Sequence, residues 1–407
     1  MPLVDMRDML HHAYENSYAV GAFDLVSLDF LEAVIGAAER ARAPVILSIA
    51  EPHFAHYDFE LMMPAVEAAA RRASVPVAIQ LDHGSSPESA ARAIRLGCNG
   101  VMLDASGQAL PDNIKVTREV VEMAHHCGIP VVGEVGYVAG QEGEGAELHP
   151  GETQLTIPSE ARVYVERTGV DFLAVSIGTV QGRQKGRAKL DFPRLKQLHN
   201  VVSVPLVIHG GSGLNEEQYR RLTALGVAKI NYFTALSDVA ADAMRARAKG
   251  DRRGSFTELK RDVKDAVREE AERCLRLWGT AGRAAEVLAR CRPMAAVELL
   301  FIADFSGLDP VELELKASRV AARLAVIPGV REVFQGEAEE GTSGSRRLCW
   351  RLRFVSGAAA RAFESHPEFE ALRREFLEGV SSERRVFSFV ELAGTGAAGL
   401  SDTRSVG

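Results

Sequence analysis

Residues 204–213 have the sequence Val-Pro-Leu-Val-Ile-His-Gly-Gly-Ser-Gly, and the fold is predicted from the pattern that they show. A short, continuous apolar run ends at His209, and glycine-rich sequence follows it. An apolar run without alternation is typical of a parallel strand that is covered on both faces, because neither side of it meets water. A helical pattern follows at Glu216–Leu225. The stretch is therefore one β/α unit.

The same unit recurs along the first 232 residues of the chain. Eight apolar runs bounded by turn signals occur there, and most are followed by a segment with helical periodicity. The expected strands are Ala19–Phe23, Val45–Ile49, Val77–Leu81, Gly100–Leu103, Val131–Val135, Phe172–Ser176, Leu206–His209 and Lys229–Asn231. Eight units in about 230 residues predict an α/β protein with a TIM (β/α)8 barrel. A doubly wound open sheet is the alternative, because periodicity does not establish closure.

The pattern changes in the last third of the chain. The expected elements there are strands at Val297–Asp304, Val330–Glu337, Arg347–Val355 and Arg385–Leu392, with helices at Pro310–Leu324, Ala358–Phe363 and Glu368–Phe376. This order predicts an α+β domain, with an antiparallel sheet and helices on one face. We therefore expect a barrel domain over 1–283, a linker over 284–294, an α+β domain over 295–392 and a disordered tail over 393–407.

Composition and charge restrict the class of protein and its partners. The 407 residues are 46% apolar and 25% charged, which excludes collagen-like, coiled-coil and wholly disordered chains. A net charge of -7 argues against binding to nucleic acid or to an anionic membrane. The start lacks a signal-peptide pattern, and five scattered cysteines indicate neither disulfides nor a cysteine zinc site. We expect a cytoplasmic protein that binds small molecules or other protein chains, with no nucleic acid and no membrane partner.

Polar side chains gather where the expected strands end. They are Asp24, Asp82, His83, Asp104, Glu134, His209 and Asn231, with Glu142, Gln181 and Lys185 in the loops beyond. The active site of a (β/α)8 barrel lies at this end of its strands. Two imidazoles with carboxylates nearby predict a divalent metal site, such as a zinc site with an open position. For a single strand-end histidine, a hydrogen-bonding role is the alternative.

The glycine-rich loop at His209–Gly213 is a candidate phosphate site. Glycines let backbone N–H groups approach an anion closely, and the loops after strands seven and eight are the usual phosphate site of barrels. A tight turn is the alternative. The loop at Gly182–Gly186 adds Arg183 and Lys185, which are either phosphate contacts or solvated charges. A metal, a phosphate and carboxylates at one mouth predict cleavage or formation of a carbon-carbon bond next to a carbonyl.

Six ordered motifs in residues 1–283 resemble those of the class II, metal-dependent fructose-bisphosphate and tagatose-bisphosphate aldolases. The motifs are Gln80–Gly84, Val101–Ser106, Gly133–Gly136 leading to Gly140–Glu142, Leu173–Leu195, His209–Gly213 and Lys229–Asn231. The resemblance implies a carbon-carbon lyase that converts fructose 1,6-bisphosphate to dihydroxyacetone phosphate and glyceraldehyde 3-phosphate in central carbohydrate metabolism, at glycolysis. One alternative is an aldolase for another phosphorylated ketose. The other is a non-catalytic barrel that serves as a scaffold or binding protein.

The resemblance also implies a role for each matching residue. Asp82 would exchange a proton with the C4 oxygen of the substrate, and Glu142 would handle the C3 proton. The implied metal residues are His83, His209 and Gln181, with Asp104 and Glu134 at an alternative or second metal position. The implied substrate and phosphate residues are Gly182, Lys185, Gly210, Gly211, Ser212, Asn231 and Thr234.

Three positions depart from the family pattern. Gln181 stands where the family has a third histidine ligand, Asp24 where it has asparagine, and Ala139 where it has glycine. An amide oxygen is a harder and weaker ligand than imidazole, so Gln181 shifts the expected preference from zinc to another divalent ion, weakens binding or leaves the site incomplete. A carboxylate at Asp24 would repel a phosphate unless it has another role.

Residues 295–392 resemble the Dabb (stress-responsive α/β-barrel) domains. The motif Ser365–Phe369 carries the resemblance, together with Phe376-Leu377, Arg385–Phe389 and Ile327–Val330. Such domains have a ferredoxin-like fold and pair their sheets, which implies a homo-oligomer, a dimer or larger. His366 precedes a proline at the start of an expected helix, where capping or packing is favoured over catalysis.

Overall fold

Eight parallel strands close into a barrel, which confirms the prediction from the repeated β/α unit. The computed structural model describes residues 2–138, 147–148, 153–184, 189–250, 255–306, 309–337, 345–377 and 381–389. The barrel strands are β1 (Val20–Asp24), β2 (Val45–Ala50), β3 (Val77–Gly84), β4 (Gly100–Leu103), β5 (Val131–Val135), β7 (Phe172–Val175), β9 (Leu206–Ile208) and β10 (Val227–Tyr232). The barrel closes where β1 pairs with β10, so the open sheet is excluded.

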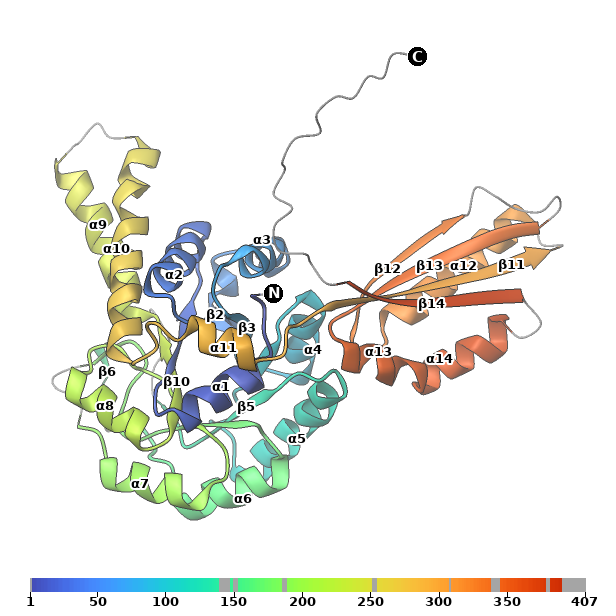
Figure 1. The fold of residues 1–407 in the computed structure, drawn as a ribbon. Helices are drawn as coiled ribbons and strands as arrows, with labels where there is room; N and C mark the ends of the chain where they lie inside the picture. The colour runs from blue at the N-terminus through green and yellow to red at the C-terminus, as the bar shows by residue number, and fades with distance from the viewer. Residues whose placement is uncertain are drawn as a thin grey trace.

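Helices surround the barrel on its outer side (Figure 1). They are α2 (Leu28–Ala41), α3 (Phe59–Arg72), α4 (Pro87–Leu96), α5 (Leu110–His126), α6 (Pro158–Thr168), α7 (Phe192–Val201), α8 (Glu216–Ala224), α9 (Thr234–Gly250) and α10 (Phe256–Leu277), with a short 3-10 turn η1 (Glu51–Ala55) after β2. Local sequence sets their ends. In α4 the Ser86 hydroxyl accepts a hydrogen bond from the backbone N–H of Ser89, and Gly97 ends the helix at φ 112°.

The inside of the barrel has a core of its own. Inward side chains such as Ala22, Ile46 and Val132 pack with Met6 and Met9 of α1 (Met6–Glu15), which lies across one end. Outward strand residues pack against the surrounding helices in a larger cluster. The end that α1 covers is the amino end of the strands, so the ionisable side chains at the carboxyl end line the open mouth.

The C-terminal part of the chain forms a separate antiparallel sheet. Its strands are β11 (Ala296–Ser306), β12 (Val330–Glu337), β13 (Ser345–Phe354) and β14 (Ser381–Phe389), in the order β12-β13-β11-β14. The helices α12 (Pro310–Ala325), α13 (Gly357–Glu364) and α14 (Pro367–Leu372), with a π turn at Arg373–Leu377, lie on one face (Figure 1). This is the βαββαβ arrangement of the predicted ferredoxin-like fold. His366 caps α14, because its Nδ1 accepts a hydrogen bond from the Glu368 N–H at 3.2 Å.

The stretch expected as a linker contains a helix. α11 (Ala284–Arg290) precedes β11, and its Val287 is buried in the cluster inside the barrel end. The two-residue strands β6 (Glu147–Leu148) and β8 (Arg183–Gln184) pair in parallel outside the barrel sheet. The expected tail over 393–407 lies outside the described residues.

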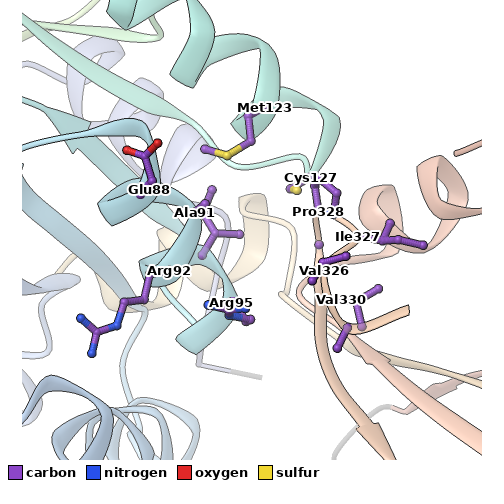
Figure 2. A pocket seen from close by; sticks show the side chains of 13 residues that line it. Glu88, Ala91, Arg92, Arg95, Met123, Cys127, Val326, Ile327, Pro328 and Val330 are labelled. Atoms are coloured by element: carbon purple, nitrogen blue, oxygen red, sulfur yellow. The ribbon is translucent and has the colours of Figure 1, made fainter. Parts of the chain in front are cut away.

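The two domains touch along the outer side of α4 and α5. A cavity of about 280 Å³ lies there, between these helices and residues 325–330 (Figure 2). Figure 2 shows Arg92 and Arg95 at one side of it and Val326, Ile327 and Pro328 at the other. The residues that line it do not include the candidate site residues, so this cavity is separate from the barrel mouth. Among the described helices, none has the length and apolar character needed to cross a bilayer.

Candidate active site at the barrel mouth

Strand β3 brings two consecutive side chains to the mouth. In a regular strand, neighbouring residues point to opposite faces. His83 instead has a left-handed backbone with φ 48°, and the pairing of β3 with β4 shifts register between Leu81 and Gly84. As a result, ligand atoms of both Asp82 and His83 lie within 4.8 Å of those of His209.

His83 is held by a carboxylate and an amide. Its Nδ1 lies 2.7 Å from Oδ2 of Asp104, whose Oδ1 accepts hydrogen bonds from the backbone N–H and hydroxyl of Ser106. Its Nε2 lies 3.0 Å from Nε2 of Gln181. Burial lowers the pKa of His83, but the carboxylates of Asp82 and Asp104 raise it more, to about 10. Whether each ring nitrogen donates or accepts depends on the tautomer, and the Gln181 amide can present either its nitrogen or its oxygen to Nε2.

A divalent ion at Nε2 would require a neutral His83 ring. A bonded partner at Nδ1 fixes the tautomer and leaves the Nε2 lone pair for a metal, as in carboxylate–histidine–metal arrangements. A divalent cation held by His83 would take the place of the Nε2 proton, and the Gln181 amide could turn its oxygen toward that position.

His209 directly follows β9 and is 1% exposed. Neither of its ring nitrogens has a hydrogen-bond partner among the described residues, and its ring centroid lies 4.5 Å from that of His83. A buried imidazole without a partner is costly unless a ligand supplies one. Burial lowers its pKa to about 3, with nearby Asp82 opposing, so the ring is neutral and suited to a metal ion.

Two groups of side chains have the spacing of a metal site. Asp82, His83 and His209 form the first group. The second consists of His83, Asp104 and Glu134. Oε2 of Glu134 has no hydrogen-bond partner among the described residues, and burial, then Asp104, raise its pKa. The orphaned atoms of His209 and Glu134, with an N and O donor set, fit a divalent cation.

Asp82 is fixed by three further side chains. Asn231 on β10 donates a hydrogen bond of 2.5 Å to Oδ2, and Gln80 on β3 donates one of 3.1 Å to Oδ1. Nζ of Lys229 lies 3.8 Å from Oδ1. Burial raises the pKa of Asp82, but the positive charge of Lys229, with the hydrogen bond from Asn231, contributes to lowering it below its usual range.

Sequence reasoning assigned no role to Gln80 or Lys229. Both are fully buried, and burial lowers the pKa of Lys229. A signal was present, because each lies two residues before a predicted site residue and therefore on the same face of its strand.

The glycine loop after β9 packs tightly against the loop after β7. Gly210 has φ 66°, and an added Cβ would lie 2.1 Å from the carbonyl oxygen of Val180. The Ser212 hydroxyl accepts a hydrogen bond from the N–H of Ala235 in the first turn of α9, next to Thr234. Loop and helix amino end thus meet at the mouth, an arrangement that suits a bound anion.

The remaining predicted residues divide into two sets. Asp24 is buried at the end of β1, and Gly182, with φ 88°, is buried after β7. Glu142, Lys185 and Ala139 lie outside the described residues. The structure therefore brings the histidines, Asp82, Asp104, Glu134, Gln181 and Asn231 to one mouth, with the glycine loop beside them.

Known proteins resemble this chain over the barrel. The family model described as fructose-bisphosphate aldolase class-II matches residues 4–283. A fructose-bisphosphate aldolase from Thermus caldophilus is 36% identical over 69% of this chain and 100% of its own length. A probable fructose-bisphosphate aldolase from Bacillus subtilis (strain 168) is 41% identical over 60% of this chain and 86% of its own length.

Solved structures agree with these matches. The YdjI aldolase from Escherichia coli K12 is 35% identical, with a TM-score of 0.61 over 69% of this chain and 99% of its own. A fructose-bisphosphate aldolase from Campylobacter jejuni, at 19% identity, shares the fold with a TM-score of 0.58 over 68% of this chain and 94% of its own.

Proposed function

The chain belongs to the class II fructose-bisphosphate aldolase family, and from that premise we propose that it cleaves fructose 1,6-bisphosphate into dihydroxyacetone phosphate and glyceraldehyde 3-phosphate. It is an aldolase, a carbon-carbon lyase that acts on a ketose bisphosphate. The observation that carries the specific proposal is the buried, unpartnered imidazole of His209 beside His83 and Asp82. Relatives named fructose-bisphosphate aldolase support the choice of substrate.

We assign the metal to His83 and His209, with Gln181 able to turn its amide oxygen toward it. Asp104 and Glu134 provide a second position that shares His83. A divalent ion bound there supplies Lewis-acid chemistry, because it polarises the ketone carbonyl next to the bond that breaks. Zinc is the proposed ion, since two neutral imidazoles suit it.

We assign the proton transfer at C4 to Asp82. During cleavage the C4 hydroxyl gives its proton to the carboxylate, the C3–C4 bond breaks, and its electron pair remains on C3 of the ketone half. The C4 oxygen becomes the carbonyl of the aldehyde product. The lowered pKa of Asp82 supports an anion that is ready to accept this proton. By family position, Glu142 would exchange the C3 proton.

We assign a substrate phosphate to the glycine loop and the amino end of α9. Backbone N–H groups near Gly210, Gly211, Ser212 and Thr234 would face it, with Gly182 and Lys185 from the neighbouring loop. Asn231 would contact the ketone half of the substrate. The close packing of Gly210 supports this assignment, because it places main chain rather than side chain at the mouth.

An aldol-cleavage assay tests the proposal. The purified chain is assayed with fructose 1,6-bisphosphate, tagatose 1,6-bisphosphate and other ketose phosphates, each with zinc, manganese, cobalt or iron. Asp82→Ala should lose cleavage by at least about a thousandfold and keep its metal. Asp112→Ala, at an exposed position on α5, is the control. Faster cleavage of another ketose phosphate would favour the alternative substrate, and no cleavage with any ion would favour a scaffold.

We further propose that residues 295–392 are a Dabb-like assembly domain and that the chain forms a homodimer or larger oligomer. The sheet face opposite the helices supports this, because it carries partly exposed Leu300 and Ile302 and Phe334, which is 43% exposed. Sedimentation of the full chain should give a dimer or larger, and Leu300→Asp with Ile302→Asp should give a monomer. A monomeric wild type would contradict the proposal.

Five free thiols support a cytoplasmic location.

A further inference from the structure

Asp82 is held from across the inside of the barrel. Its partners Lys229 and Asn231 lie on β10, which β1 and β2 separate from β3. Gln80 and Lys229 each lie two residues before a mouth residue, so they form a layer directly below the mouth. We call Gln80, Lys229 and Asn231 the Asp82 clamp.

The clamp treats the two carboxylate oxygens differently. Oδ1 accepts a hydrogen bond from Gln80 and lies 3.8 Å from the Lys229 ammonium. Oδ2 accepts one hydrogen bond, from Asn231, and lies 3.8 Å from Nε2 of His83, the nitrogen that faces the candidate metal position. Since a carboxylate oxygen has two lone pairs, Oδ2 keeps one for a further donor at the mouth.

Keeping Gln80 and Lys229 inside the barrel is costly. Both side chains are fully buried, and the Lys229 nitrogen has no hydrogen bond of ordinary length among the described residues, since Oδ1 of Asp82 lies 3.8 Å away. A buried ammonium without a hydrogen-bonded partner destabilises a protein, and an apolar side chain of similar volume would pack at least as well. A contribution to stability therefore does not explain why Gln80 and Lys229 occupy these buried positions. The need to orient a reacting carboxylate does explain it.

We propose that Gln80 and Lys229 are positioning residues, which hold Oδ1 of Asp82 so that Oδ2 is the oxygen that takes the C4 hydroxyl proton. This inference rests on the aldolase function proposed above. It separates two reactions of the same site. Cleavage needs the C4 proton transfer, whereas exchange of the C3 proton of dihydroxyacetone phosphate with solvent does not, because that product has no C4.

The test compares both reactions in the metal-loaded full chain. Gln80→Met and Lys229→Met keep side-chain volume and remove the donor or the charge. Each should lower kcat for cleavage by about tenfold or more, with KM within about twofold. The C3 exchange of dihydroxyacetone phosphate, followed by proton NMR in heavy water, should stay within about twofold of the wild type. Gln80→Glu should lose more cleavage than Gln80→Met, because its carboxylate repels that of Asp82.

Controls keep the outcomes distinct. Gln197→Met, at an exposed position of α7, should leave both reactions unchanged. Thermal unfolding and metal content of each variant identify a folding defect, and Gln80 and Lys229 give two independent substitutions. Equal loss of both reactions, or no loss of cleavage, in a folded and metal-loaded variant would overturn the inference. A wild-type chain that neither cleaves nor exchanges would overturn the proposed function itself.

Discussion

Arg331 on β12 donates two hydrogen bonds to the carboxylate of Glu67 on α3, at 2.8 Å to Oε1 and 2.7 Å to Oε2. The pair joins the C-terminal sheet to the barrel, and its side chains are only 12% and 18% exposed. Ser356 makes a second link, because its hydroxyl donates to the carbonyl of Cys127 at 2.5 Å. Bidentate pairs of this kind fix orientation as well as contribute energy.

Removal of Arg331 should loosen the sheet from the barrel. We expect Arg331→Met to lower the free energy of unfolding of the C-terminal domain by about 2 kcal/mol, because hydrogen bonds to a charged partner are lost. Urea unfolding, monitored by limited proteolysis, measures this free energy of unfolding. Arg71→Met is the matched control, because Arg71 also bonds Glu67 but lies on the same helix. A smaller loss for Arg331→Met than for the control would contradict the prediction.

Acid should weaken the same link. Burial raises the pKa of Glu67, but Arg331 and Arg71 lower it to about 2, from an ordinary value of 4.5. A depressed folded-state pKa stabilises the fold above the ordinary value, and that stabilisation, on the order of 3 kcal/mol, is lost as pH falls from about 4.5 toward 2. The stability difference between wild type and Glu67→Gln should therefore shrink between pH 5 and pH 3 (about the range of this titration). A stability difference between the two proteins that does not change with pH would contradict the predicted role of Glu67.

Metal content should depend on His209. Its two nitrogens have no partner among the described residues, so a bound ion is the group that would satisfy one of them. We expect His209→Ala to carry at least about tenfold less divalent metal after dialysis. His126→Ala, at an exposed position of α5, should keep it. Equal loading of the two variants by elemental analysis would remove His209 from the ligand set.

Gln181 should limit zinc affinity. Gln181 is 6% exposed and its amide nitrogen lies 3.0 Å from Nε2 of His83, so a donor at this position would be next to the nitrogen that we assign to the metal. Gln181→His should raise zinc affinity by about tenfold or more, because imidazole binds zinc better than an amide does. Competition with a chromogenic chelator measures the affinity, with Gln181→Ala as the comparison. Zinc binding no tighter than that of the wild type would show that position 181 does not reach the ion.

Substitution of Gly210 and of Gly213 by alanine should distinguish the cost of backbone strain from the cost of steric overlap. Both have positive φ, but an added Cβ at Gly210 would lie 2.1 Å from the carbonyl oxygen of Val180, whereas one at Gly213 would meet no atom within 4 Å among the described residues beyond its chain neighbours. Gly213→Ala should cost about 1 kcal/mol of backbone strain. Gly210→Ala should cost several times more and raise KM, since the loop must move. Calorimetry and cleavage kinetics report the two effects, and equal melting temperatures would contradict the comparison.

The barrel could be predicted from sequence because its strands are short apolar runs bounded by turn signals, and a segment with helical periodicity follows most of them. The helix α11 could not, since its seven residues are too few for a clear period. The candidate site was predictable where residues follow strand ends, as for His83 and His209. The contacts of Gln80 and Lys229 were not, because they depend on which distant strand faces which across a closed barrel.

The left-handed backbone of His83 limits how this chemistry can move between proteins. On a straight strand, an aspartate followed by a histidine would send one side chain into the mouth and the other toward the surrounding helices. If the Asp-His pair were introduced at the end of a regular strand in another protein, only one of the two side chains would therefore point into the site. A design that copies this site must copy the left-handed backbone at the histidine as well as the two residues. Suitable scaffolds are therefore proteins whose strand ends already have such a bend.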